Sequence, residues 1–190
     1  MADAGRVIAG TARGTKLEAP GPGTRPLADR VKQTLFAILE PELRGAHFVD
    51  LFAGSGAAGI EALSRGAAIA TFVEQDQGAI RVIKANLAKT NLAGHGTVIA
   101  SEALAWIRAA ARSVPVTTWT HAFVDPPYAD TALLANVLET IGPLIVPGGQ
   151  VVAKHFWRDT PPATVGLLAS ERERRFGETT LTFYRRLEDG

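Results

Sequence analysis

Segments typical of β-strands and of α-helices alternate along most of this 190-residue chain. The predicted strands are short apolar runs that cover residues 47–52, 69–74, 97–100, 120–124 and 149–154. The predicted helices carry apolar residues at helical spacing and cover residues 57–65, 77–91, 102–111 and 130–141. Strands that alternate with helices are joined by right-handed crossovers, so they form a parallel sheet with helices on both faces. The sequence therefore predicts a doubly wound, Rossmann-like α/β fold.

Two further regions flank this pattern. Residues 1–45 are expected to form an N-terminal arm, because short extended pieces joined by glycines at 6–17 predict a β-hairpin and the apolar spacing at 28–39 predicts a helix. The tail predicts two strands that form an antiparallel edge hairpin, at 164–170 and 179–186. Residues 46–190 are therefore expected to form one domain with a mostly parallel sheet, preceded by the arm.

The composition is that of a compact soluble protein and excludes a disordered or fibrous chain, with 46% hydrophobic and 21% charged residues. No apolar run approaches the ~18 residues needed to span a bilayer, and the first residues lack the apolar core of a signal peptide. The chain has no Cys, which excludes disulfides, a thiolate nucleophile and a cysteine metal site. The four His residues are scattered without ligand spacing, so no metal is expected. These features predict a cytoplasmic location.

The first predicted strand runs into a glycine-rich turn that precedes a helix. Small residues let the backbone approach a ligand closely, and the helix N-terminus offers unpaired N–H groups. Twenty positions after Gly54 the next strand ends in Glu74, whose carboxylate can accept hydrogen bonds from both hydroxyls of a ribose. This spacing fits NAD as well as S-adenosylmethionine. The candidate cofactor-binding residues at these two turns are Asp50, Phe52, Ala53, Gly54, Ser55, Gly56, Glu74 and Gln75.

The segment 122–128, Ala-Phe-Val-Asp-Pro-Pro-Tyr, helps to decide between NAD and S-adenosylmethionine. Its prolines have no N–H for a sheet ladder, so the strand must stop and present Asp125 and Tyr128 at its carboxyl end. A carboxylate, a free carbonyl and a flat ring suit a planar aromatic amine, such as the amino group of a nucleobase. A dinucleotide would need a pyrophosphate seat and hydride chemistry, whereas Asp50 would repel a pyrophosphate and could accept from the amine of S-adenosylmethionine. In a doubly wound sheet, the glycine turn and Asp125 are expected to face one crevice.

Together these residues resemble the class I S-adenosylmethionine-dependent methyltransferases that carry an Asp/Asn-Pro-Pro-Tyr/Phe motif and modify amino nitrogens. The arm is similar to that of the RsmD family, which are bacterial 16S ribosomal RNA guanine-N2 methyltransferases. The similar segments outside the two motifs are Arg6-Val-Ile-Ala-Gly, Arg13-Gly14, Leu17, Thr24-Arg25-Pro26, Asp29-Arg30-Val31-Lys32, Leu35-Phe36, Phe176-Gly-Glu-Thr179 and Tyr184. The motif at 125–128 is shared by many amino methyltransferases, so the arm and the chain length carry the family-specific part. The resemblance implies methylation of the 2-amino group of one guanine in 16S rRNA, within a 30S subunit or a late assembly intermediate. We expect the protein to act as a monomer.

The candidate catalytic residues are Asp125, Pro126, Pro127 and Tyr128. The exocyclic nitrogen of guanine is a poor nucleophile because its lone pair is delocalised into the ring. If Asp125 and the Pro126 carbonyl accept its two hydrogens, the nitrogen can turn its lone pair toward the sulfonium methyl, and positioning of this kind can contribute ~7–11 kcal/mol. Tyr128 would stack on the base. The alternatives are that Asp125 caps the helix near residue 130 and that Tyr128 packs in the core.

Several other residues have candidate roles. In the wider superfamily an acid or amide after the third strand often hydrogen-bonds the adenine amine, which makes Glu102 a candidate for this contact. Glu102 could equally be an acid in the first turn of a helix. Arg25 could meet the methionine carboxylate of the cofactor. The candidate RNA-binding residues are Arg6, Arg13, Lys16, Arg30, Lys32 and Trp157. The basic ones could hold phosphates without reading sequence, or could be solvated surface charges. Trp157 could flank the target base, or could serve packing.

Four other functions stay open. A DNA adenine-N6 methyltransferase shares the motif order, but no insert of the size of a DNA-recognition domain is visible. A protein glutamine methyltransferase would keep the same fold, and the basic arm argues only weakly against it. A nicotinamide oxidoreductase would need hydride chemistry that these residues do not supply. A catalytically silent RNA-binding assembly factor would not need Asp125 and Glu74.

Overall fold

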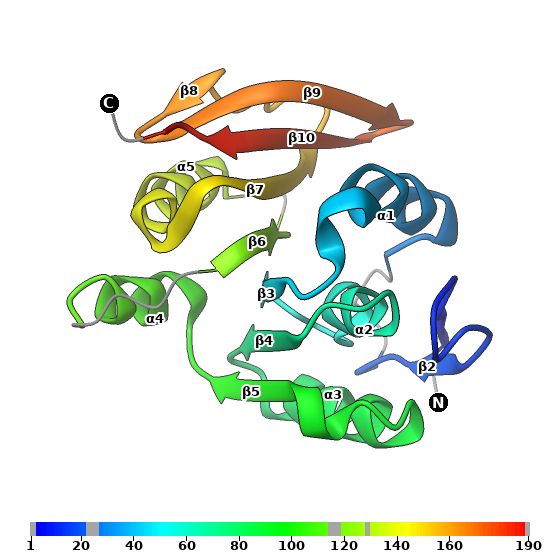
Figure 1. Cartoon of the computed structure of the whole chain (residues 1–190). Helices are drawn as coiled ribbons and strands as arrows, with labels where there is room; N and C mark the ends of the chain where they lie inside the picture. Colours follow the sequence, from blue (N-terminus) through cyan, green and yellow to red (C-terminus); the bar gives the residue numbers. More distant parts are fainter. Residues whose placement is uncertain (1–2, 22–26, 114–118, 128–129, 189–190) are drawn as a thin grey trace. The chain divides into compact units, whose positions relative to one another are not determined.

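The computed structural model describes residues 3–21, 27–113, 119–127 and 130–188. The chain forms two compact units, Met1–Ser101 and Glu102–Gly190, which are described separately (Figure 1). The predicted arm belongs to the first unit, together with the first α/β repeats. The boundary between residues 45 and 46 therefore stays a prediction about domain organisation.

The first unit holds a small antiparallel hairpin and a parallel three-stranded sheet. The hairpin and the helix that follows are β1 (Asp3–Arg6), β2 (Lys16–Glu18) and α1 (Asp29–Leu43). The sheet and its connections are β3 (His47–Leu51), α2 (Ala57–Ser64), β4 (Ile69–Glu74), α3 (Gln77–Lys89), η1 (Ala93–His95) and β5 (Gly96–Ala100). Strand β4 pairs in parallel with β3 on one side and β5 on the other, so Thr71 lies opposite Val49 and Thr97. Helix α3 runs beside β5 (Figure 1). The predicted parallel arrangement of these strands is confirmed.

Apolar periodicity and capping explain where α3 forms. Its buried positions include Ala79, Ile80, Ile83 and Leu87, a spacing that places them on one helical face. The helix begins after Asp76, whose Oδ1 accepts a hydrogen bond from the Ala79 amide at 2.7 Å, as a helix N-cap does. These two signals fix the helix directly after the turn that ends β4.

The second unit joins a parallel strand pair to an antiparallel edge. Its elements are α4 (Ala103–Ala110), β6 (Trp119–Val124), α5 (Thr131–Ile141), η2 (Gly142–Leu144), β7 (Ile145–Phe156), β8 (Thr164–Val165), β9 (Leu168–Phe176) and β10 (Thr179–Arg186). Strand β6 pairs with β7 in parallel, and the antiparallel pairs are β7–β10, β10–β9 and β9–β8 (Figure 1). The predicted antiparallel edge is confirmed. It is larger than the predicted hairpin, because β9 continues through the charged segment 171–175.

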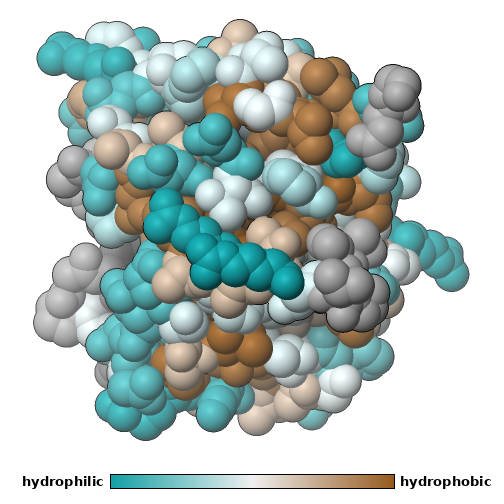
Figure 2. Space-filling model, turned by 90° about the vertical axis from the view of Figure 1, so that its left-hand side faces the viewer, coloured by the Kyte–Doolittle hydropathy of each residue, from teal (hydrophilic) through white to brown (hydrophobic). Residues whose placement is uncertain are grey.

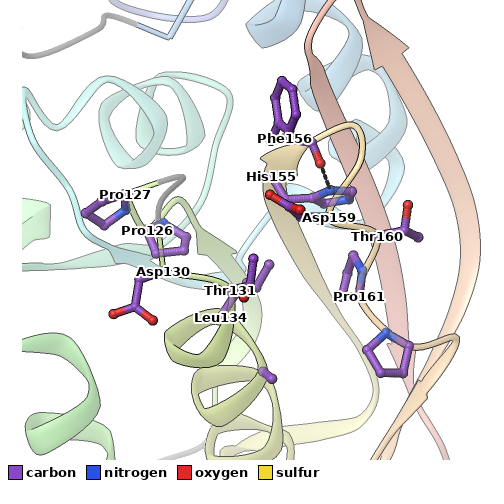
Figure 3. A pocket seen from close by; sticks show the side chains of 12 residues that line it. Pro126, Pro127, Asp130, Thr131, Leu134, His155, Phe156, Asp159, Thr160 and Pro161 are labelled. Carbon is purple, nitrogen blue, oxygen red and sulfur yellow. Dashed lines mark hydrogen bonds between the residues drawn. The ribbon is translucent and has the colours of Figure 1, made fainter.

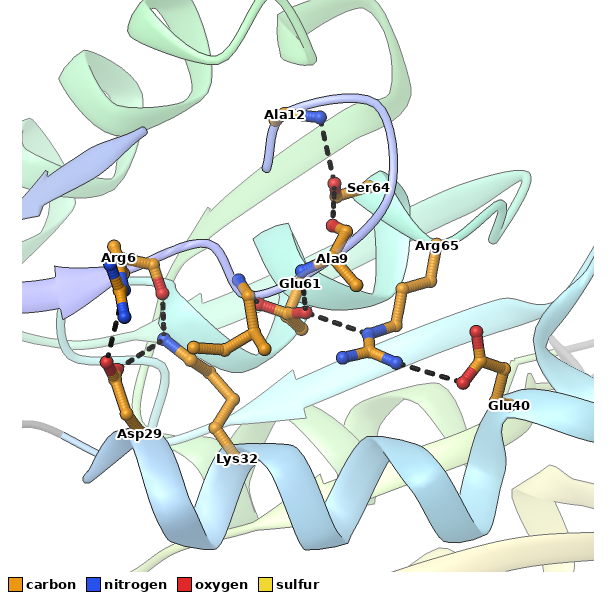
Figure 4. A network of polar contacts seen from close by, with 10 residues as sticks. Arg6, Ala9, Ala12, Asp29, Lys32, Glu40, Glu61, Ser64 and Arg65 are labelled. Atoms are coloured by element: carbon orange, nitrogen blue, oxygen red, sulfur yellow. Dashed lines mark hydrogen bonds and ion pairs between the residues drawn. The ribbon is translucent and has the colours of Figure 1, made fainter. Parts of the chain in front are cut away.

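Buried polar contacts fasten the N-terminal segment to α2 (Figure 4). Glu61 of α2 is fully buried, and its two carboxylate oxygens accept hydrogen bonds from the amides of Ile8 at 2.8 Å and Ala9 at 3.0 Å. Ser64, one turn later, accepts from the amide of Ala12 at 3.0 Å and donates to the carbonyl of Ala9 at 2.6 Å. Side chains of α2 therefore hold the loop between β1 and β2 through hydrogen bonds to its backbone.

Lys32 of α1 takes part in the same network and departs from its predicted role. Its side chain is fully buried, and Nζ donates to the carbonyl of Arg6 at 2.6 Å and lies 3.7 Å from the Asp29 carboxylate. Burial lowers the pKa of Lys32, whereas the charges of Glu61 and Asp29 oppose this shift. Lys32 therefore joins the hairpin to α1 and does not present its charge to an RNA phosphate.

The described surface contains few large apolar side chains. The exposed ones are Ile69, Leu167 and Leu187. On the face shown in Figure 2, hydrophobic residues form separate patches between hydrophilic ones. Among the residues that the structure describes, no helix has both the length and the apolar character needed to cross a membrane.

Candidate functional site

The glycine-rich turn of the first unit follows β3 and leads into α2. Its backbone is left-handed at Phe52 (φ 63°), Gly54 (φ 56°) and Gly56 (φ 77°), and the Gly56 amide closes the turn on the Ala53 carbonyl at 2.7 Å. A non-glycine residue at positive φ is uncommon and costs free energy, so the surrounding structure must hold Phe52 in this conformation. The N-terminus of α2 has no side-chain cap. Backbone N–H groups there can act as donors to a ligand.

Asp50 and Glu74 hold this turn against the sheet. Asp50 exposes only 2% of its surface, and its Oδ2 accepts from the Gly59 amide at 2.9 Å. Oε2 of Glu74, at the carboxyl end of β4, accepts from the Gly54 amide at 2.8 Å. The other oxygen accepts from the amides of Gln75 at 2.8 Å and Asp76 at 2.9 Å. The structure thus brings Glu74 to the glycine turn, as the sequence predicts, and adds backbone contacts that the spacing alone does not reveal.

Glu102 begins the second unit and caps α4. Its two carboxylate oxygens accept from the amides of Leu104 at 2.8 Å and Ala105 at 2.6 Å. Glu102 therefore acts as an acid at the start of a helix, which is one of the two roles that the sequence allows. A contact between Glu102 and an adenine amine stays a prediction. Arg25, the candidate for the cofactor carboxylate, lies outside the described residues.

Asp125 directly follows the last residue of β6 and forms an ion pair with a lysine. Nζ of Lys154 donates to both carboxylate oxygens of Asp125, at 2.8 Å each. Burial raises the pKa of the Asp125 carboxyl, while the charge and hydrogen bonds of Lys154 oppose that rise. Of the neighbouring motif residues, Pro126 is buried and Pro127 is exposed, and Tyr128 lies outside the described residues. Asp125 is thus a partly buried carboxylate with a fixed counter-charge.

The alternative in which Asp125 caps the following helix is wrong, because Asp130 performs that task. Oδ1 of Asp130 accepts from the Leu133 amide at 2.8 Å and caps α5. The amide of Asp130 in turn donates to the Pro127 carbonyl at 3.1 Å. The capping position is filled five residues after Asp125, so the carboxylate of Asp125 is not needed to start α5.

Lys154 is the functional candidate that sequence reasoning missed. It is the last residue of the apolar run predicted at 149–154, as Asp125 directly follows the run at 120–124. Neighbouring parallel strands bring their carboxyl ends to one edge of the sheet, so charges of opposite sign at two such ends could have been paired from the sequence. The register confirms this signal, since Val124 lies opposite Ala153.

A pocket of about 310 Å³ adjoins the motif within the second unit. One side is formed by Pro126 and Pro127 with the first turn of α5, and the other by the end of β7 and the segment that follows it (Figure 3). His155 lines this side and hydrogen-bonds the Phe156 carbonyl through Nδ1 at 2.8 Å. Asp130 and Asp159 also line the pocket. Their carboxylates favour ligand groups that donate hydrogen bonds and disfavour a phosphate.

The remaining candidate RNA contacts differ in exposure. Arg13, Lys16 and Arg30 are exposed. Arg6 exposes 64% of its side chain and lies 3.6 Å from the Asp29 carboxylate, so its charge is shared with an acid. Their contact with RNA stays a prediction.

Trp157, after β7, packs against two arginines. The guanidinium carbon of Arg175 lies 3.9 Å from the Trp157 ring centroid and that of Arg158 lies 4.8 Å away. The indole is half-buried and both arginines are exposed. Cation–π contacts of this kind place positive charge beside an aromatic surface, a combination that suits single-stranded nucleic acid.

Comparison with known proteins places the chain in a family. The family model described as conserved hypothetical protein 95 matches residues 5–185. A putative rRNA methyltransferase YlbH of Bacillus subtilis is 38% identical over 184 residues, which cover 95% of this chain and 98% of the relative. The ribosomal RNA small subunit methyltransferase D of Escherichia coli K12 is 44% identical over 140 residues, which cover 72% of this chain and 68% of the relative.

Solved structures agree with these sequence matches. The putative methyltransferase yhhF from Escherichia coli matches with a TM-score of 0.83 and 33% identity, over 97% of this chain and 98% of that chain. An RNA methyltransferase from Salinibacter ruber, solved with S-adenosyl-L-homocysteine, has a TM-score of 0.64 and 14% identity over 87% of this chain and 95% of its own, and supports the fold alone. The predicted fold class and the predicted family are both confirmed, and this chain belongs to the RsmD family of methyltransferases.

Proposed function

We propose that this protein transfers a methyl group from S-adenosylmethionine to the exocyclic 2-amino group of one guanine in the 16S rRNA of the small ribosomal subunit. The relatives named as rRNA methyltransferases support the reaction type and the RNA substrate. The observation that carries the choice of an amino group is the Asp125 carboxylate, presented at the end of β6 directly before two prolines. A carboxylate accepts N–H hydrogens, and an amino nitrogen is the nucleophile that brings them.

The first unit supplies the groups that would bind the methyl donor. Glu74 can accept the ribose hydroxyls, and the left-handed turn at Gly54 and Gly56 lets the backbone approach the ligand closely. S-adenosylmethionine supplies an electrophilic methyl group on a sulfonium sulfur. Asp50 is engaged by the Gly59 amide, so it shapes the turn and adds negative charge near the cofactor amine.

The residues that bind the methyl acceptor, the guanine amino group, then account for the reaction. Asp125 and the Pro126 carbonyl accept the two hydrogens of the guanine amino group and orient its lone pair toward the methyl carbon. The N–CH₃ bond forms as the S–CH₃ bond breaks, and the electron pair of that bond stays on sulfur in S-adenosylhomocysteine. The nitrogen becomes acidic as this happens, so it releases one proton through Asp125 to water. The residue thus acts chiefly by orientation, which can contribute ~7–11 kcal/mol.

The target base must leave its stack to reach Asp125. That step costs a few kcal/mol and costs less in a loop or in rRNA whose folding is unfinished. The exposed basic residues of the hairpin region and the Trp157 cluster with Arg158 and Arg175 would hold the backbone of the surrounding RNA. We therefore infer that the substrate is rRNA within a 30S particle or a late assembly intermediate, and that the protein acts as a monomer in the cytoplasm.

A methyl-transfer assay with labelled S-adenosylmethionine tests the proposal. It would offer 30S particles that lack the modification, stripped 16S RNA, duplex DNA and protein fractions in parallel. We expect label on 30S particles, recovered as N2-methylguanosine, and loss of that label by at least about 100-fold in Asp125→Ala, since general acid–base and orienting groups of this kind contribute about 10²–10⁴-fold. Glu139→Ala, an exposed change on α5 of the same unit, is the matched control and should methylate normally. Label on DNA adenine or on protein glutamine would refute the rRNA assignment.

A further inference from the structure

The pairing of Asp125 with Lys154 is imposed by the sheet. Strands β6 and β7 are parallel and Val124 lies opposite Ala153, so the next residue of each strand falls at the same level. Those two residues are Asp125 and Lys154, and Nζ lies 2.8 Å from both carboxylate oxygens.

The pair is largely removed from water. The side chain of Lys154 exposes 11% of its surface and that of Asp125 exposes 22%. An ammonium group in such surroundings needs a compensating charge, and the carboxylate supplies it. A carboxylate offers about four acceptor positions on its two oxygens, and one ammonium uses one position on each. The Asp125 carboxylate therefore keeps acceptor capacity for a hydrogen of the target amine while it is bound to Lys154.

We propose that Lys154 is a positioning residue for methyl transfer, because its ammonium group holds Asp125 in one orientation and as the carboxylate that accepts the target amine. This inference rests on the proposed function. Lys154 acts through Asp125 and does not itself touch the reacting atoms. Its role would be distinct from stability alone, since the ammonium group favours the ionised form of the acceptor.

The direction of the pH effect follows from the two opposing influences on Asp125. Burial raises the pKa of Asp125 and Lys154 opposes the rise, so removal of Lys154 leaves burial unopposed. The carboxyl group then stays protonated to higher pH, and a protonated carboxyl loses an acceptor position and gains an O–H donor. The acid limb of the pH–rate profile should therefore move to higher pH when Lys154 is removed.

Three other titratable groups of the second unit make hydrogen bonds away from Asp125. Asp130 caps α5, and His155 on β7 hydrogen-bonds the Phe156 carbonyl and the Thr182 hydroxyl of β10. Glu173 on β9 accepts from the same hydroxyl at 3.2 Å. Within the described part of this unit, Lys154 is accordingly the charge that acts on Asp125.

The test compares pH–rate profiles for single-turnover methylation of 30S particles. For Lys154→Met we expect the acid limb to move to higher pH, so that activity falls on the acid side of the profile and recovers as the pH is raised. Lys154→Arg keeps the charge and should stay close to the wild-type profile. Lys84→Met, an exposed change on α3, is the matched control for loss of one lysine and should leave the profile unchanged.

A second measurement does not depend on activity. The carboxyl carbon of Asp125, followed by ¹³C NMR against pH, should titrate at higher pH in Lys154→Met than in the wild type. In an Asp125→Asn background residue 125 cannot ionise, so Lys154→Met should no longer move any acid limb that remains. The inference is overturned if the profile and the carboxyl titration of Lys154→Met superimpose on those of the wild type. Higher activity of Lys154→Met at every pH would also overturn it, because Lys154 would then be a competitor for Asp125.

The same design separates this inference from the proposed function. If the wild-type protein labels no guanine, the proposed function fails, and the NMR titration still decides whether Lys154 sets the ionisation of Asp125. If the wild type labels guanine and the Lys154→Met titration does not move, the inference alone fails. Thermal unfolding of each variant, followed by circular dichroism, identifies any that does not fold, and Lys154→Gln, which also removes the charge, then carries the comparison.

Discussion

At the scale of single residues, Gly59 shows how the glycine motif shapes the first unit. A Cβ atom built at this position would lie 2.3 Å from a ring carbon of Phe72, far inside contact distance. Phe72 is fully buried on β4, so its ring cannot swing away into solvent. The absence of a side chain at Gly59 therefore lets α2 approach β4 closely, which is the packing task of the third glycine in a fingerprint of this kind.

Gly59→Ala should destabilise the protein by about 1–3 kcal/mol, the usual cost of forcing an extra methyl group into a packed core. Gly94→Ala is the matched control, because no atom lies within 4 Å of the Cβ it would add, and its effect should stay within about 0.5 kcal/mol. Urea unfolding measures both free energies. Equal stability of the two variants would show that α2 can move away from β4 at little cost.

Single residues also show what the sequence could and could not predict. The places of Asp125 and Glu74 at strand ends were predictable, because each follows or ends an apolar run. Lys32 was misassigned because its charge suggests a solvated surface, whereas the hairpin covers it and gives it a carbonyl partner. Burial of a lysine depends on which distant segment packs over it, and periodicity along α1 carries no information about that segment.

At the scale of elements, a buried carboxylate of α2 anchors part of the hairpin region. Glu61 accepts hydrogen bonds from Ile8 and Ala9, and its Oε1 also accepts from Nε of Arg65 at 2.8 Å. Arg65 in addition reaches Glu40 of α1 at 3.1 Å. The exposed fractions of the two glutamate side chains differ widely, 0% for Glu61 and 59% for Glu40. The two acids therefore share a partner and differ in burial, which makes them a natural comparison.

Glu61→Ala should destabilise the protein by about 3–5 kcal/mol, since it leaves Arg65 and two amides without a buried partner. Glu40→Ala removes an exposed ion pair with the same arginine and should cost at most about 1 kcal/mol. Chemical unfolding gives the free energies, and hydrogen exchange at the amides of Ile8 and Ala9 should accelerate only in Glu61→Ala. Unchanged exchange at those amides would contradict the view that Glu61 anchors the segment.

Elements also differ in how well the sequence predicts them. The bounds of the helices and central strands were predicted to within a few residues. Their apolar residues recur with the spacing of a helix or a strand, so the sequence pattern marks each element. Strand β9 was only partly predicted, since its residues from Glu171 to Arg175 are all exposed and charged. Its position depends on backbone pairing with β10 and β8, and backbone hydrogen bonds leave no hydrophobic pattern in a sequence.

At the scale of the whole molecule, ligand binding should raise the free energy of unfolding. S-adenosylhomocysteine at one hundred times its Kd should stabilise the folded protein by about 2.7 kcal/mol, because a ligand that binds only the folded state shifts the unfolding equilibrium. For a chain of this size that is a rise in Tm of roughly 5–10 °C. Glu74→Ala should lose most of the rise, whereas Glu178→Ala, an exposed change between β9 and β10, should keep it. Differential scanning calorimetry measures both, and an undiminished rise in Glu74→Ala would show that the ribose is bound elsewhere.

The three amides that Glu74 accepts have a consequence for the heat of cofactor binding. A carboxylate offers about four acceptor positions, and Gly54, Gln75 and Asp76 occupy three of them. If a ribose diol donates both of its hydrogen bonds to this carboxylate, it needs two positions, so one of the three backbone hydrogen bonds has to break as the cofactor binds. Two hydrogen bonds to the ribose would then replace one within the protein, so the bond that breaks offsets part of the enthalpy of ribose binding.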